Sequence, residues 1–207
     1  MSAITQAEPT PAVPEQAHPV SEKIDATETL YRLTVREYER IGGMLDDDRI
    51  ELIDGYLVKK MVKNPPHVIA CRLVDTEIMR IAAVGWHTRA GDPIRISGRT
   101  EPEPDVVLVR GIFKDYAARH PGPSDIALVV EVADTTLAKD RRRTRTYGPA
   151  GIPIYWIVNL IGRQVEVYSG PSSSGYSSRI DFLTGQYVPV VIGGVQVGTI
   201  AVDAILP

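Results

Sequence analysis

Two acidic residues, Asp105 and Glu131, stand at the ends of two apolar segments of β-strand length. Asp105 directly precedes VVLVR, and Glu131 follows the continuous apolar run 126–130. If the segments pair antiparallel with the acids opposite each other, Arg110 faces Ile126 and both acids lie at the same end of the ladder. Such carboxylates are partly desolvated and repel each other, so a cation is needed to keep both ionised. The pattern predicts a divalent-metal site.

Magnesium suits this pair because it accepts one or two carboxylates and completes its octahedron with waters and phosphate oxygens. The alternative is structural. Asp105 would then be a turn residue after Pro104, and Glu131 would pair with a nearby arginine. Ion-pair networks perturb buried acids much as functional sites do, so the two acids alone leave both interpretations open, and we prefer the metal site.

A third acid, Glu51, lies in segment 49–60, which predicts two short strands around the turn dipeptide Asp54-Gly55. Its neighbours Ile50 and Leu52 are apolar, so an alternating strand would turn Glu51 towards solvent. From the pattern alone we prefer this solvent-facing interpretation.

Three segments have helical patterns. The first begins with the capping box of Thr34 and ends at Gly42-Gly43, and the second runs from Pro65 to about Val84 with one apolar stripe. His67, in the first turn of the second helix, is a capping or packing residue or a weak phosphate contact. The third helix spans 135–146 and carries five cations, which are either solvated surface or a phosphate-binding patch: Lys139, Arg141, Arg142, Arg143 and Arg145.

Composition narrows the classes of protein. The chain has 207 residues, 43% of them hydrophobic, which suits one domain with a real core, and its net charge of −3 confines any nucleic-acid binding to a local patch. A single cysteine excludes an internal disulfide. The proline-rich segment 1–28 predicts a disordered tail. Because the chain has neither a signal peptide nor about 20 consecutive apolar residues, we expect a soluble, cytoplasmic protein without membrane contact.

The remaining segments predict a sheet. IPIYWIVNL has the pattern of a buried strand, QVEVYSG that of a half-exposed one, and 172–178 that of a loop. Gly193-Gly194 predicts a second hairpin. We therefore predict a single α/β domain over 29–207, with a mixed central sheet flanked by helices. Additional C-terminal strands would extend the sheet or form the surface of a homodimer.

Several motifs occur in a fixed order between Leu33 and Val167: RIELIDGYLV, Pro104-Asp105, VVEVAD and YGPAGIPIYWIVNL. In this set the chain resembles the Uma-type family of bacterial endonucleases, a branch of the PD-(D/E)XK superfamily with the restriction-endonuclease-like fold. The resemblance implies Mg²⁺-dependent hydrolysis of DNA, with Mn²⁺ as an alternative ion. It also implies that Asp105, Glu131 and the backbone carbonyl of Val132 bind the metal, and that Glu51 completes the acidic cluster.

One position departs from the family. The superfamily pattern has a lysine two residues after the glutamate, where this chain has Ala133. Members of the family supply this lysine from the next helix, four residues before a tyrosine. Tyr147 makes that position Arg143, with Thr144 as the alternative match. An arginine can neutralise charge on a phosphate but cannot lose a proton to activate water, and Lys139 is the only nearby amine.

These observations lead us to predict a Mg²⁺-dependent endonuclease whose catalytic residues are Glu51, Asp105, Glu131 and Arg143. The other cations of the helix would bind DNA, namely Lys139, Arg141, Arg142 and Arg145. Two alternatives stay open. The first is a nucleic-acid-binding or regulatory protein that keeps the fold without cleavage, and the second is an interaction module whose acids are structural.

Overall fold

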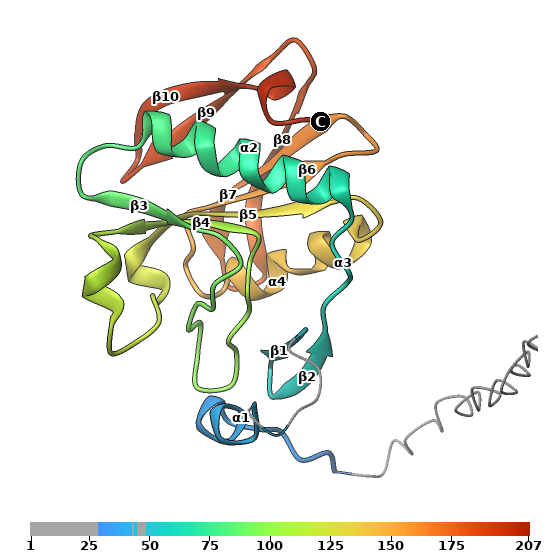
Figure 1. Ribbon diagram of the computed structural model, residues 1–207, viewed down its shortest axis with the longest axis vertical. Helices are drawn as coiled ribbons and strands as arrows, with labels where there is room; N and C mark the ends of the chain where they lie inside the picture. Colours follow the sequence, from blue (N-terminus) through green and yellow to red (C-terminus); the bar gives the residue numbers. More distant parts are fainter. Residues whose placement is uncertain (1–28, 43, 45–48) are drawn as a thin grey trace, which may run out of the picture. The chain divides into compact units, whose positions relative to one another are not determined.

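Six strands form the central sheet of the protein, in the order β3-β4-β5-β6-β7-β8 (Figure 1). The computed structural model describes residues 29–42, 44 and 49–207, so the predicted tail lies outside the described residues. The strands are β3 (Trp86–Arg89), β4 (Val106–Arg110), β5 (Ile126–Ala133), β6 (Ile154–Asn159), β7 (Gln164–Ser172) and β8 (Gly175–Leu183). Strands β5 and β6 pair parallel and the other neighbours antiparallel, which confirms the predicted mixed sheet.

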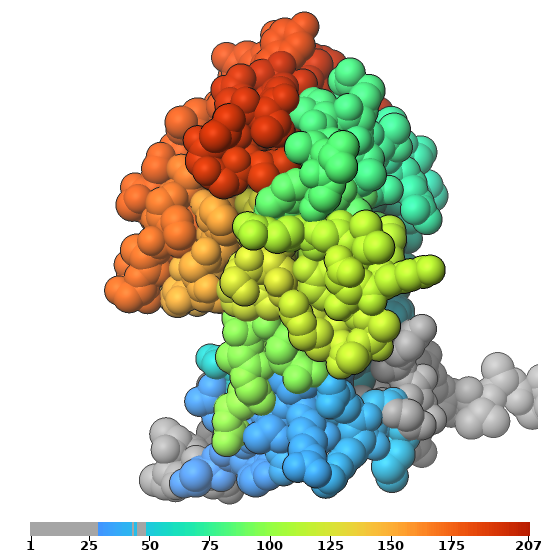
Figure 2. Space-filling view, turned by 90° about the vertical axis from the view of Figure 1, so that its left-hand side faces the viewer, coloured from blue at the N-terminus to red at the C-terminus, as the bar shows by residue number. Residues whose placement is uncertain are grey.

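Apolar residues cover both faces of this sheet. On one face, even-numbered residues of β5 such as Leu128 and Val130 pack in one cluster with α2 (Pro65–Ile81) and the hairpin β9 (Tyr187–Ile192) and β10 (Val195–Ala201). In Figures 1 and 2 this red hairpin lies beside the green end of α2. On the opposite face, Val129 packs in a second cluster with Tyr147. That face is covered by two short helices, α3 (Leu137–Arg142) and α4 (Thr144–Tyr147), within the β5–β6 crossover.

A separate two-stranded sheet, β1 (Ile50–Ile53) with β2 (Tyr56–Lys59), confirms the predicted hairpin. Its turn needs positive φ, which Asp54 (57°) and Gly55 (84°) supply. Three backbone hydrogen bonds attach it to the segment before β4, from Gly55 N to Arg99 O (2.7 Å), from Glu101 N to Leu52 O (2.8 Å) and from Leu52 N to Glu101 O (3.4 Å). The helix α1 (Val35–Gly42) is joined to the same segment through Val35 N and Gly98 O (2.8 Å).

The register of β4 on β5 differs from the prediction at one end. Val106 pairs with Val130, so Asp105 and Glu131 do fall at the same end of the ladder. Further along, Val109 and not Arg110 pairs with Ile126, because the register shifts after Leu108. A shift of this kind is typical of a β-bulge, which adds one residue to one of two paired strands.

The predicted helix over 135–146 is also wrong in detail, because it divides at Arg143 into α3 and α4. Arg143 has ψ of −14°, and the Thr144 hydroxyl donates to the carbonyl oxygen of Arg141 (2.7 Å), which competes with regular helical hydrogen bonding. The second helix ends at Ile81 and not near Val84.

Two predictions for the C-terminal third are wrong. The segment 172–178 comprises the last residue of β7, the turn 173–174 and the first part of β8, and β7 is buried on both sides from Val165 to Tyr168. Glu166, fully buried, receives a bidentate contact from Arg141 of α3 (3.0 and 2.6 Å) and a further ion pair from Arg179 of β8 (3.2 Å). The face of β7 that we expected to be exposed to solvent is therefore covered by the charged side chains of Arg141 and Arg179. Within the described residues, no helix is long and apolar enough to cross a membrane.

Candidate active site

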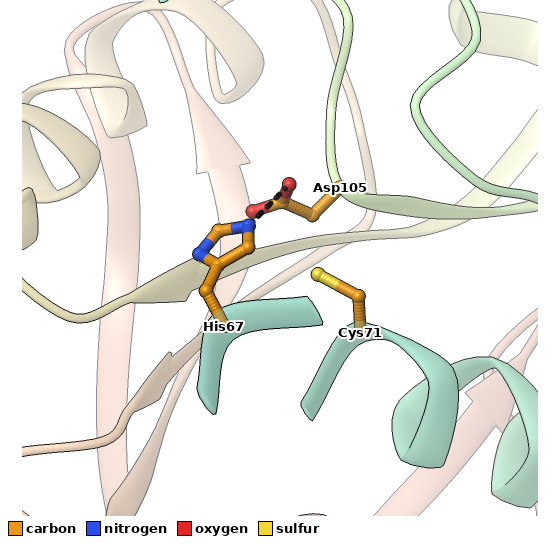
Figure 3. Close-up of side chains that lie close together, drawn as sticks. All are labelled: His67, Cys71 and Asp105. Atoms are coloured by element: carbon orange, nitrogen blue, oxygen red, sulfur yellow. Dashed lines mark hydrogen bonds and ion pairs between the residues drawn. The ribbon is translucent and has the colours of Figure 1, made fainter. Parts of the chain in front are cut away.

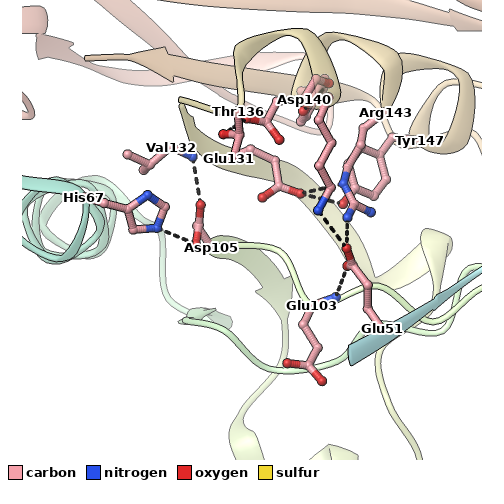
Figure 4. Close-up of polar contacts among 12 residues, drawn as sticks. Glu51, His67, Glu103, Asp105, Glu131, Val132, Thr136, Asp140, Arg143 and Tyr147 are labelled. Carbon is pink, nitrogen blue, oxygen red and sulfur yellow. Dashed lines mark hydrogen bonds and ion pairs between the residues drawn. The ribbon is translucent and has the colours of Figure 1, made fainter. Parts of the chain in front are cut away.

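Asp105 lies immediately before β4, and neighbours bind both of its carboxylate oxygens. Oδ1 contacts His67 Nε2 and Lys63 Nζ, each at 3.0 Å, and Oδ2 accepts from the backbone N–H of Val132 (2.9 Å) (Figure 4). Burial alone would raise the pKa of Asp105, but the hydrogen bond and charge of His67, with the charge of Lys63, hold this pKa below its usual value. Asp105 is therefore a buried, ionised carboxylate.

Glu131 is on the last part of β5 and shares the sheet face of Val129, so its side chain extends towards α4. Its Oε1 accepts a hydrogen bond from the Tyr147 hydroxyl (2.9 Å) and lies 3.6 Å from Arg143 Nε. Burial raises its pKa to about 8, against the attraction of Arg143 and with further repulsion from Asp105. Figure 4 shows its other carboxylate oxygen on the side of Asp105, so the two acids flank one space.

Glu51 faces inwards from β1 and is only 1% exposed, so the solvent-facing interpretation is wrong for this residue. Its Oε1 forms a close ion pair with Arg143 Nη2 and lies 3.3 Å from Lys139 Nζ. Its Oε2 accepts weakly from the backbone N–H of Glu103 (3.4 Å). Two cations of the third predicted helix therefore meet the acid of the hairpin.

A cleft of about 100 Å³ opens over these groups. It is lined by acids and bases in similar number, and the acids include Asp140, whose pKa burial raises to about 6. The charged residues of the lining are Glu51, Lys60, Lys63, His67, Glu103, Asp105, Glu131, Asp134, Lys139, Asp140 and Arg143. Arg143 is itself buried, and its Nη1 is a buried nitrogen without a hydrogen-bond partner among the described residues.

The family comparison covers most of the chain. A sequence model of the Uma2 family, described as "Putative restriction endonuclease", matches residues 35–197. The chain belongs to the Uma2 family. The expected relationship to restriction-endonuclease-like proteins is thereby confirmed.

A solved structure agrees with this assignment. The fold is similar to that of "a putative nuclease belonging to DUF820" from Anabaena variabilis ATCC 29413, with a TM-score of 0.64 over 84% of this chain and 97% of that chain. The two sequences are 14% identical, so the similarity shows the fold alone. The comparison with curated proteins found no match.

The predicted cations of this Uma2 chain separate into two groups. Lys139 and Arg143 point into the cleft, one helical turn apart, whereas Arg141 binds Glu166 away from it. Arg142 and Arg145 are exposed. The DNA-binding role of these residues and the metal-binding role of the Val132 carbonyl stay predictions. The structure adds an observation on Val132, whose N–H orients Asp105.

Sequence reasoning missed three contributors to the cleft of this Uma2 protein. Lys63 and the weakly considered His67 both contact Asp105, and the Tyr147 hydroxyl binds Glu131. The only signal for Lys63 and His67 was their place beside Asn64, which caps α2 by accepting from His67 N (3.1 Å). Nothing in the sequence indicates which strand the start of that helix faces.

The raised pKa of Glu131 predicts that metal binding releases a proton. At pH 6.5 Glu131 is mostly protonated, and a metal ion binds only the carboxylate, so about one proton leaves per ion bound. Because this pKa is raised, release is largest below about pH 8, apparent affinity rises as the pH rises through this value, and release disappears near pH 9. Calorimetry of Mg²⁺ binding in buffers of different ionisation enthalpy measures the proton count. Equal counts at both pH values would contradict the assignment.

Proposed function

We propose that this Uma2 chain is a Mg²⁺-dependent endonuclease that hydrolyses DNA phosphodiester bonds in the cleft. The observation that carries the proposal is the pair of buried carboxylates, Asp105 and Glu131, on adjacent strands and facing one space beside a buried arginine. Membership of a restriction-endonuclease family supports the reaction type, and such families generally use divalent metal ions. A DNA substrate supplies the anion that the cationic side of the cleft requires.

The residues of the cleft fit the expected ion. Asp105 and Glu131 offer only hard oxygen donors, which Mg²⁺ and Mn²⁺ prefer. An ion bound there would polarise the phosphate and lower the pKa of a water molecule. The Lys63 ammonium lies 3.0 Å from Asp105 and neutralises the charge of this carboxylate. Because the Lys63 side chain is half exposed, it can move into solvent when a metal ion binds Asp105.

The other residues act on the phosphate and the water. Arg143 is held by Glu51 and Glu131, and its positive charge beside Glu131 would stabilise the negative charge that grows on the phosphate during hydrolysis. Lys139, unlike Arg143, can lose a proton, and its ammonium lies 3.3 Å from Glu51. Glu51 with Lys139 would therefore orient the attacking water and transfer its proton.

A second candidate function follows from Ala133 and Arg143, which stand where the family pattern has an amine. It is a protein that binds DNA in the same cleft without cleaving it. Conversion of supercoiled plasmid to nicked or linear DNA separates the two. We expect conversion with Mg²⁺ or Mn²⁺ and none with a chelator. Metal and DNA binding without conversion would establish the second candidate. If the protein bound no metal ion, with or without DNA, both functions would be refuted, and Asp105 and Glu131 would have a structural role.

Removal of the Lys139 amine is expected to slow cleavage about 100-fold or more, in the range of general acid–base effects. Lys139→Met removes the proton-transfer group, and Lys139→Arg keeps the charge without restoring the rate because an arginine stays protonated. Plasmid nicking at saturating Mg²⁺ measures both variants. Lys114→Met, an exposed lysine on the 3₁₀ segment Phe113–Tyr116, is the matched control. If Lys139→Arg were fully active, Lys139 would not transfer a proton and would only contact the phosphate.

Three further expectations from the sequence belong to this proposal. Arg142 and Arg145 would bind DNA backbone outside the cleft, so their substitution would weaken DNA binding and reduce its salt dependence. A homodimer and a cytoplasmic location also stay predictions.

A further inference from the structure

A second group of potential metal ligands lies at the edge of the cleft, and it includes a thiol. His67 and Cys71 are one turn apart on α2, and Asp105 approaches both from the start of β4 (Figure 3). One ligand atom from each of the three residues lies within 4.8 Å of the other two. Cys71 and Asp105 are buried, and the His67 side chain is 14% exposed. Glu131 is not part of this group.

We propose that His67, Cys71 and Asp105 bind a zinc ion. Residues four apart on a helix project from the same side, which brings the imidazole and the thiol together. Nitrogen, sulfur and oxygen donors suit Zn²⁺, which accepts three protein ligands with water as the fourth. Magnesium avoids thiols, so Asp105 is the one ligand that the two ions would share.

The surrounding residues hold this group in place. Asn64 caps α2 at the turn that carries His67, and Pro65 and Pro66 stiffen that turn. Asp105 orients the His67 ring through Nε2, at 3.0 Å, while Val132 N–H holds the other Asp105 oxygen. A ligand set that is already assembled loses little conformational entropy when the ion binds.

Two contacts must break and one proton must leave for zinc to bind. The ion replaces the His67 to Asp105 hydrogen bond, and Lys63 leaves Asp105 for solvent, which its half-exposed side chain permits. The Cys71 thiol must also lose its proton. The metal takes the place of this proton, which passes to solvent.

Sharing Asp105 makes the two ions competitors. Zinc on Asp105 would take a ligand from the magnesium site, so the metal-dependent cleavage proposed above would be inhibited by zinc. This consequence rests on the proposed function. The binding of zinc itself does not require that the chain cleaves DNA.

The test uses Co²⁺ as a spectroscopic substitute for zinc, on the reduced full-length protein. Cys71 is the only cysteine of the chain, so a sulfur-to-cobalt charge-transfer band can arise only from this residue. We expect the band to saturate near one equivalent of Co²⁺, to disappear when Zn²⁺ is added, and to be lost in Cys71→Ser. His67→Gln should weaken cobalt binding without removing the thiol. Absence of the band in the folded wild type would overturn the proposal.

A Glu131→Gln variant distinguishes this site from the magnesium pair. It removes a proposed magnesium ligand and leaves all three zinc ligands, so the cobalt band should persist. Loss of the band in this variant would show that cobalt needs Glu131 and would overturn the ligand set. A band in a protein that fails to cleave plasmid would support the zinc site while refuting the nuclease. Circular dichroism of each variant verifies that the fold is intact.

Discussion

Replacement of Glu131 by glutamine is expected to reduce Mg²⁺-dependent DNA cleavage about a thousand-fold or more. A divalent ion at the scissile phosphate supplies several kcal/mol of transition-state stabilisation, and each 1.4 kcal/mol is about tenfold in rate. Glutamine keeps the size of the side chain and can still accept the hydrogen bond from Tyr147, but its neutral amide is a poor ligand for Mg²⁺. Single-turnover nicking of supercoiled plasmid at saturating Mg²⁺ measures the change.

The matched control is Glu77→Gln, the same chemical change on α2, where Glu77 pairs with Arg80 at 2.7 Å outside the cleft. We expect this control to cleave at the wild-type rate. Urea unfolding should show that Glu131→Gln is no less stable, because at neutral pH it replaces a carboxyl whose charge is already disfavoured by burial. A Glu131→Gln protein that cleaves normally would remove this residue from the proposed site.

Replacement of Arg143 by methionine is expected to lower the free energy of unfolding by about 3–5 kcal/mol, the typical cost of breaking a buried ion pair. Arg143 is 7% exposed and Glu51 is 1% exposed, so the substitution leaves a carboxylate inside the protein with only Lys139 nearby as a counter-charge. Urea unfolding of the metal-free protein at pH 7.5 measures the loss.

A second substitution tests the cause of this loss. Glu51→Gln in the Arg143→Met background removes the stranded charge, so the double variant should be more stable than Arg143→Met alone. Arg142→Met, one position earlier and exposed, should change stability by no more than about 0.5 kcal/mol. Additive effects of the Glu51 and Arg143 substitutions would mean that the pair contributes no coupling.

The fold was predictable where a local sequence pattern is compatible with only one type of secondary structure. The apolar run before Glu131 could only be a buried strand, and Asp54-Gly55 could only turn a hairpin, so both elements were correct. The errors have a different origin. The pattern of QVEVYSG suggested one wet face, because the sequence does not show that Arg141 and Arg179 converge on Glu166. A strand whose charged residue is buried in an ion pair has the same alternating sequence pattern as a strand with one solvent-exposed face.

The site divides in the same way. The prediction assumed an antiparallel register with Asp105 and Glu131 at the same end of the ladder, and the pair Val106–Val130 agrees with it because the register shift after Leu108 lies further along. The inward orientation of Glu51 could not be predicted from the sequence. Alternation along a hairpin shows which residues share a face, but not which face the rest of the protein covers. The position of Lys139 beside Glu51 depends on how the β5–β6 crossover folds back on the sheet, a long-range contact that no local pattern encodes.

The hairpin that carries Glu51 pairs with no strand of the central sheet. It is held by hydrogen bonds to segment 97–101 and by the contacts of Glu51 with Arg143 and Lys139. Its opening therefore needs no rupture of the six-stranded ladder. Local and global unfolding should then appear as separate classes of amide exchange, with Leu52 and Gly55 exchanging faster than Leu128 and Val130. An acid of the cleft could be withdrawn and returned while the main core stays folded. The complete cluster would then be a state that the native protein repeatedly leaves and regains.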